Sequence, residues 1–99
     1  MSCVGKRLRA ARILAGLSQE QLGVQAGIEE ASASARMNRY ERGTRAPAVE
    51  IMERIAGVLD LPVSYFYSQD DDEASLLLAF HRMPGKRRKE LLKSVLSSS

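Results

Sequence analysis

A group of cationic and hydrogen-bonding side chains between residues 34 and 45 is the part of the sequence best suited to chemistry. Guanidinium groups bind phosphate oxygens and the two acceptors on the edge of guanine, while amides and hydroxyls hydrogen-bond other base edges. The group therefore predicts a surface that binds a nucleic acid. Its members are Ser34, Ala35, Arg36, Asn38, Arg39, Arg42, Thr44 and Arg45, of which the alanine alone is apolar.

The apolar residues around this group predict that a helix presents it. An inward line spaced i, i+4, i+7 predicts a helix over about 32–42. At 100° per residue, Asn38, Arg39 and Arg42 then face outward. Arg36 lies on the flank of the same helix. Such a face meets the requirement for entering the major groove, because it can hydrogen-bond base edges and tolerates phosphates beside it. The inward line consists of Ala33, Met37 and Tyr40.

A shorter helix is predicted just before this one. Residues 18–21 have the S-x-x-Q spacing of a capping box, in which the Ser18 hydroxyl accepts from the backbone N–H of Gln21 and the Gln21 side chain bonds back. About two helical turns follow, and a tight turn over 27–30 leads into the next helix. Two short helices joined in this way, the second with a basic outer face, have the geometry of a helix-turn-helix.

The remaining segments also have helical periodicity, so the predicted fold class is all-α. None of them alternates with period two over a length that favours a strand. We expect a five-helix domain over 1–67, an acidic linker over 68–73 and a C-terminal helical extension over 74–99. The helix that opens at Pro47 is expected to bury Val49 with the rest of its apolar face. The predicted segments outside the helix-turn-helix are 4–15, 47–59, a short turn from Pro62, 74–82 and 84–96.

Composition and charge limit the function classes. Residues 1–47 carry eight Lys/Arg against four Glu, which favours a polyanionic partner. Cys3 is the only cysteine and His81 the only histidine, so no disulfide, metal cluster or Cys/His catalytic pair is predicted. No apolar run approaches the ~20 residues of a membrane span. We therefore expect a cytoplasmic protein that is not an enzyme and binds no cofactor, metal ion, membrane or small-molecule ligand.

Beyond these patterns, the sequence resembles the Cro/C1-type repressors of the XRE family, which include lambdoid phage repressors. The resemblance covers residues 4–67, about two-thirds of the chain. It implies a lambda-repressor-like, five-helix DNA-binding domain whose helix over 32–42 enters the major groove. The segments that carry it are Leu17-Ser18-Gln19-Glu20-Gln21-Leu22, Ala26-Gly27-Ile28, Arg39-Tyr40-Glu41-Arg42-Gly43, Pro47 and Ile55-Ala56-Gly57-Val58-Leu59 before Phe66.

The resemblance also implies roles for individual residues. Gln19 matches a position that contacts phosphate and braces the following helix. Arg12 and Glu41 match an ion pair that ties the first helix to the end of the DNA-reading helix. Three further positions face base edges in relatives, and three meet the phosphate backbone. The first are Ser34, Ala35 and Arg39, and the second are Arg42, Thr44 and Arg45.

The sequence departs from the family between the turn and Gly43. The segment from Glu29 to Gly43 is about one helical turn longer than is usual in relatives. Either the turn is lengthened or the helix is extended at its N-terminal end. Because Arg36 lies on the helix flank, it has a second interpretation, a surface ion pair with Glu29 or Glu30.

Together these observations predict a sequence-specific regulator of transcription that binds double-stranded DNA, a repressor acting as a homodimer on a palindromic operator. A single helix-turn-helix contacts too few bases to select one site, so two-fold protein symmetry is expected to match a two-fold operator. Apolar residues within 74–97 need burial, either against Ile13 and Leu14 of the first helix or against a second copy. A second hypothesis is a protein-interaction or antitoxin-type module, since the additional residues lie beside the recognition surface.

Overall fold

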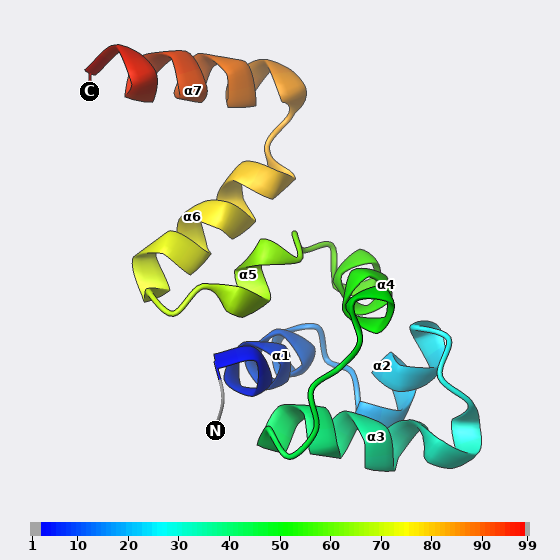
Figure 1. Ribbon diagram of the computed structural model, residues 1–99. Coiled ribbons are helices and arrows are strands. Elements are labelled where there is room, and N and C mark those ends of the chain that lie inside the picture. The colour runs from blue at the N-terminus through cyan, green and yellow to red at the C-terminus, as the bar shows by residue number, and fades with distance from the viewer. Residues whose placement is uncertain (1–2, 99) are drawn as a thin grey trace.

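The computed structural model describes residues 3–98, and every regular element within that range is an α-helix (Figure 1). The prediction of an all-α fold is confirmed. No helix in the described part of the chain is long and apolar enough to cross a membrane. The helices are α1 (Cys3–Leu14), α2 (Gln19–Gln25), α3 (Glu30–Arg42), α4 (Val49–Leu59), α5 (Ser64–Tyr67), α6 (Asp71–Arg82) and α7 (Gly85–Ser98).

Helices α1 to α5 enclose one apolar core. All five contribute large side chains that are fully buried, and the predicted inward line of α3 is buried as expected. Burial of one such side chain stabilises a fold by about 1.5–3 kcal/mol relative to leaving it in water. The core therefore fixes the positions of all five helices. Its largest apolar members are Leu8, Leu22, Met37, Met52, Ile55 and Phe66.

Two glycines determine where α3 lies and where it ends. A Cβ at Gly23 would stand 2.9 Å from the Ala33 Cβ and 3.1 Å from Met37 Cγ, so only glycine lets α2 and α3 cross this closely. Gly43 follows the last residue of α3 with a φ of 76°, in the left-handed region that glycine adopts without strain.

The additional residues of the helix-turn-helix extend α3 rather than the turn. Helix α3 begins at Glu30, two residues before the predicted start at Ser32. The turn stays tight because the Ile28 side chain is buried and its backbone N–H donates to the Gly23 carbonyl at 2.9 Å. Since this anchor fixes the end of the turn, the extra length falls at the N-terminal end of α3.

Helix α4 differs from the prediction at its start. It begins at Val49, with Ala48 as the N-cap residue, and not at Pro47. The prediction that Val49 is buried is wrong, because 61% of it is exposed and Ile51 is buried instead. Val49 is the first helical residue, so its side chain extends beyond the edge of the core that the later turns cover.

The acidic segment after the domain is mostly helical. The predicted linker over 68–73 is shorter in the structure, since α6 begins at Asp71. The Asp70 carboxylate accepts from the backbone N–H of Glu73 at 2.9 Å and caps the helix. Carboxylates are stabilised at this end of a helix by the partial positive charge of its dipole. The acidic run therefore starts a helix instead of keeping the chain extended.

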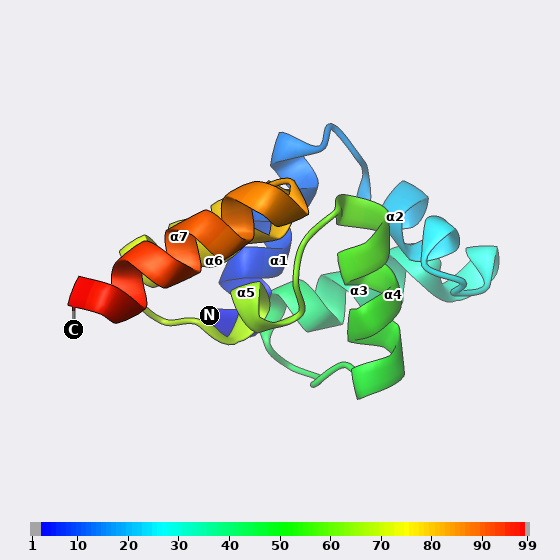
Figure 2. The same cartoon turned by 90° about the horizontal axis from the view of Figure 1, so that it is seen from above.

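Helices α6 and α7, together called the arm, extend from one side of the domain (Figures 1 and 2). Helix α6 lies against α5 and buries Ala74, with Leu78 partly buried, whereas α7 buries none of its residues. The radius of gyration is 14.9 Å, compared with about 13 Å for a compact chain of this length. The arm thus leaves apolar side chains exposed instead of folding back over the domain.

Within one chain, the arm does not bury the apolar residues at the C-terminal end of α1. Ile13 is 52% exposed and Leu14 is 85% exposed. Leu14 lines only a small cavity of about 140 Å³, which it shares with Leu78 of α6. The link between α1 and the arm instead lies at the other end of α1, where Arg7 forms an ion pair with Asp71.

Candidate nucleic-acid interface

The junction of α2 and α3 is held by side-chain hydrogen bonds. The predicted capping box is present: the backbone N–H of Gln21 donates to Ser18 Oγ at 3.0 Å, and the Ser18 N–H donates to Gln21 Oε1 at 2.8 Å. Gln19 Nε2 donates to Asn38 Oδ1 and to Glu41 Oε1, both at 3.3 Å. Gln19 therefore connects the start of α2 to two successive turns of α3, which fixes the orientation of the α3 outer face.

A buried ion pair holds the C-terminal half of α3 against α1. Arg12 Nε donates to Glu41 Oε2 at 2.6 Å and Arg12 Nη2 donates to Glu41 Oε1 at 3.0 Å. The Glu41 side chain is only 2% exposed, and the Arg12 side chain is 13% exposed. Arg12 Nη1 also donates to the Leu17 carbonyl at 2.9 Å. This bidentate geometry is the strongest form of a carboxylate–guanidinium contact, so the pair orients α3 on the domain.

The outer face of α3 and the loop after it form a cationic surface. Among residues 3–98, Arg39, Arg42 and Arg45 have no ion-pair partner. Two unpaired cations on the helix and a third on the loop after it suit a polyanion, because phosphate would supply the missing counter-charges. The predicted site residues that are exposed here are Ser34, Ala35, Arg39, Arg42, Thr44 and Arg45.

Two of the predicted site residues on α3 itself form side-chain contacts within the chain. Asn38 is half-buried and its Oδ1 accepts the hydrogen bond from Gln19. Arg36 lies on the flank, where its Nη2 donates to the Tyr40 hydroxyl at 2.8 Å. The guanidinium also stands 5.9 Å from the centre of the Tyr40 ring. Arg36 therefore pairs with the residue one turn later instead of with Glu29 or Glu30.

The loop after α3 closes against the end of that helix. The Thr44 N–H donates to the Arg39 carbonyl at 3.1 Å, which satisfies one of the free carbonyls of the last turn. Arg45 lines a shallow cavity together with Val4 of α1 and Tyr67 of α5. The loop is thus anchored at its start, and Arg45 lies beside the N-terminal end of α1.

The order and geometry of these elements match a known sequence family. Its pattern, described as helix-turn-helix, matches residues 8–66, which is more than half of the chain. The chain belongs to the helix-turn-helix family. This confirms the Cro/C1-type resemblance of the sequence, and membership of this family agrees with the prediction that the protein is not an enzyme. Within residues 3–98, no three His, Cys, Asp or Glu side chains gather to hold a metal ion.

Individual relatives are similar to the chain over different lengths. Uncharacterized HTH-type transcriptional regulators of Sinorhizobium medicae (strain WSM419) and Rhizobium meliloti (strain 1021) are each 36% identical over 64 residues, or 65% of the chain. The chain covers 43% of each of these relatives. The crystal structure of the transcriptional regulator BswR is similar with a TM-score of 0.87 at 44% identity, covering 94% of the chain and 92% of BswR. The likeness to BswR therefore extends beyond the five-helix domain into the arm.

Some contacts between distant parts of the chain are not predictable from the sequence. The hydrogen bonds of Arg7 reach residues 61 and 62 positions away, and no periodic pattern indicates them. The contact between Arg36 and Tyr40 was also missed, although its i, i+4 spacing on a helix could have indicated it.

Proposed function

We propose that this protein is a sequence-specific transcriptional repressor that places α3 in the major groove of a palindromic operator as a homodimer. The observation that carries the proposal is the outer face of α3, where Arg39 and Arg42 are exposed and unpaired while Gln19 and Glu41 hold the helix in place. A helix that is already held in place suits base reading, because its backbone loses little conformational entropy when the complex forms. Repression follows from occupation, since a dimer bound across a promoter excludes polymerase.

Within the α3 face we assign base reading first to Arg39. A guanidinium can bind guanine O6 and N7 through two parallel hydrogen bonds. Asn38 is less free to read adenine, because adenine recognition uses the amide oxygen that already accepts from Gln19. Ser34 and Ala35 are exposed and short, so they suit close contacts to base edges. Arg42, Thr44 and Arg45 lie toward the end of the helix, where backbone phosphate is the expected partner.

Arg39→Ala is expected to weaken binding to the operator by about 1–3 kcal/mol and to relax the preference at one base pair in each half-site. The reason is that the bidentate contact to one base is lost while the phosphate contacts remain. Binding should be measured by titration against the operator and against its single-base variants. An equal loss on operator and random DNA would assign Arg39 to phosphate instead.

Arg45→Ala is expected to weaken binding to all DNA alike. Each phosphate contact that is lost should make the slope of log K against log salt shallower by about one unit. The measurement is a salt titration with operator and with random duplex DNA, using Arg54→Ala on the exposed part of α4 as a charge-matched control. A slope equal to that of the unaltered protein would show that the loop is not part of the DNA interface.

The arm supports dimerisation as part of the proposed function. A groove of about 210 Å³ between α6 and α7 is lined only by apolar side chains. Exposed apolar surface of this kind marks an interaction site. We assign a second copy of the arm as its occupant, on the basis of the charges at the two ends of the groove. The lining residues are Leu76, Leu77, Phe80, Leu91, Leu92 and Val95.

The charges of the arm favour an antiparallel pairing. The first turn of α6 is acidic, and it lies at the open end of the groove, away from the connection between the two helices (Figure 1). The first turn of α7 carries the basic run 86–89 at the closed end. An antiparallel α7 from a second copy would bring its basic run beside the acidic turn. Parallel pairing would place like charges together, which opposes association.

A DNA-binding assay separates this proposal from a protein-interaction module. The proposed regulator should give a specific, salt-dependent complex with DNA selected from a random pool, and it should lower expression from a reporter whose promoter overlaps that site. A module without DNA function would enrich no sequence, although it could still dimerise through the arm.

A further inference from the structure

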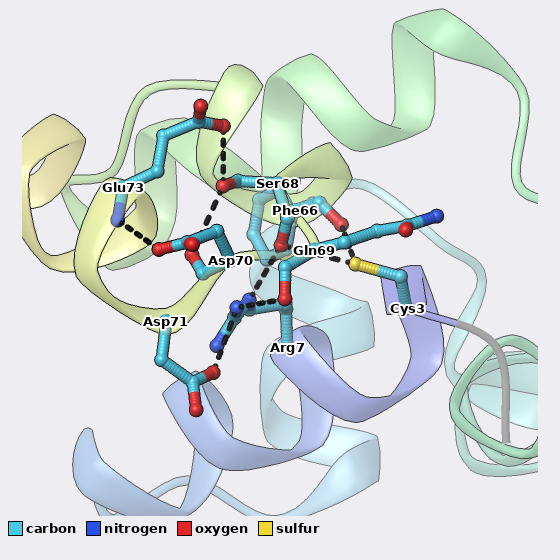
Figure 3. A network of polar contacts seen from close by, with 8 residues as sticks. All are labelled: Cys3, Arg7, Phe66, Ser68, Gln69, Asp70, Asp71 and Glu73. Carbon is cyan, nitrogen blue, oxygen red and sulfur yellow. Dashed lines mark hydrogen bonds and ion pairs between the residues drawn. The ribbon is translucent and has the colours of Figure 1, made fainter.

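The junction between the domain and the arm is closed by side chains from α1 (Figure 3). Arg7 Nε donates to the Ser68 carbonyl at 3.0 Å, and Arg7 Nη2 donates to the Gln69 carbonyl at 3.4 Å. The same Nη2 lies 3.0 Å from Asp71 Oδ1, at the first residue of α6. One guanidinium therefore binds the first two residues of the connecting segment 68–70 and the start of the arm. We call this set of contacts the clasp.

The clasp is a half-buried structure and not a surface ion pair. The Arg7 side chain is 13% exposed, and its guanidinium lies 5.8 Å from the centre of the Tyr65 ring. Cys3 Sγ donates to the same Ser68 carbonyl at 3.1 Å. Asp71 is 83% exposed, so its charge contributes little. The carbonyl contacts hold the chain. They bind the backbone just after the short helix α5, where the carbonyls have no partner within a helix.

The connecting segment is also fixed on its arm side. Ser68 is 4% exposed, and its hydroxyl donates to Glu73 Oε1 at 2.6 Å. At the far end of α6, Arg82 Nη2 donates to the Leu59 carbonyl at 3.2 Å. Between these two attachments, α6 buries only Ala74. With so little apolar burial, the direction of α6 relative to the domain depends on the attachments at its ends.

We propose that Arg7 is a positioning residue that sets the spacing and phase of the two half-sites which the dimer accepts. The inference rests on the proposed function, in which the arm joins two copies. The path from one α3 to the other then runs through each domain, each clasp and the paired arms. Insertion of one base pair moves a half-site by about 3.4 Å and rotates it by about 34°. A dimer rejects this change only if the junctions between domain and arm are stiff.

The test compares Arg7→Gln with Arg9→Gln, which removes the same charge from an exposed position of the same helix. Each protein is titrated against the palindrome that the unaltered protein selects from random DNA, and against versions with one base pair added or removed at the centre. Hydrogen exchange of the amides of 73 and 74, which donate to Asp70, reports on the clasp without DNA. Sedimentation and binding to a single half-site report on dimerisation and on the fold.

We expect the unaltered protein and Arg9→Gln to bind the altered spacings at least about tenfold more weakly than the selected palindrome. For Arg7→Gln this difference in affinity should fall below about threefold. The amides of 73 and 74 should exchange faster, while half-site affinity and dimerisation stay unchanged. The spacing preference of Arg7→Lys should lie between those of the unaltered protein and Arg7→Gln. An ammonium keeps the charge but cannot bind both carbonyls in the same fork geometry.

The other outcomes overturn the inference at distinguishable steps. Unchanged exchange in Arg7→Gln would show that the clasp does not hold the arm. Faster exchange with a retained spacing preference would show that the clasp does not set the spacing. If the unaltered protein is monomeric or accepts every spacing equally, the proposed dimeric function fails, and the role of Arg7 fails with it.

Discussion

Glu41→Ala is expected to lower the free energy of unfolding by about 3–5 kcal/mol. The Glu41 side chain is 2% exposed and accepts from Arg12 at 2.6 and 3.0 Å and from Gln19 at 3.3 Å. Its removal leaves the Arg12 guanidinium desolvated, with only the Leu17 carbonyl as a partner. The measurement is denaturant unfolding followed by circular dichroism. Glu53→Ala, at an exposed position of α4, is the matched control and should change stability by less than about 0.5 kcal/mol.

A double-mutant cycle tests whether the loss comes from the pair. Arg12→Ala alone should also destabilise, because it leaves the buried carboxylate without its cation. The double variant should lose clearly less than the two single losses combined, since no charge is then left unpaired. Purely additive losses would mean that Arg12 and Glu41 act independently. Operator binding of Glu41→Ala should weaken too, because the orientation of α3 depends on this contact.

Replacing Leu92 and Val95 together by glutamate is expected to convert the proposed dimer to a monomer and to lower operator affinity by about 10²–10⁴-fold. Both residues line the apolar groove of the arm, and they are 49% and 54% exposed. Because they are exposed in the single chain, the change should leave the domain folded. The affinity falls because one bound half-site no longer holds a second domain close to the other half-site.

The matched control introduces two glutamates at Ser94 and Ser97, which lie on other faces of α7 and outside the groove lining. Sedimentation at equal concentration should find the control protein dimeric and the groove variant monomeric, with equal affinities for a single half-site. A groove variant that remains dimeric would place the dimer interface elsewhere, with exposed Ile13 and Leu14 of α1 as the next surface to alter.

Local sequence signals were sufficient for the helix-turn-helix itself. The capping box at Ser18 forms because its partners are three residues apart, so that the helix start is decided by neighbours in the chain. The inward line of α3 is buried as its periodicity predicts, and Gly43 ends the helix because the left-handed conformation there suits glycine. The same periodicity failed for Val49, because it cannot tell how far the core reaches beyond the first turn of a helix.

The sequence by itself thus determined the fold class, the family and the face of α3 that carries the cations, since each depends on spacings of a few residues. Only the tertiary structure decided that the additional residues extend the N-terminal end of α3. It alone also decided that Arg36 pairs with Tyr40 and that Arg7 binds the start of the arm. These depend on where separate helices meet in space. A hydrogen bond between residues more than sixty positions apart follows from packing geometry, and periodicity along the chain contains no information about it.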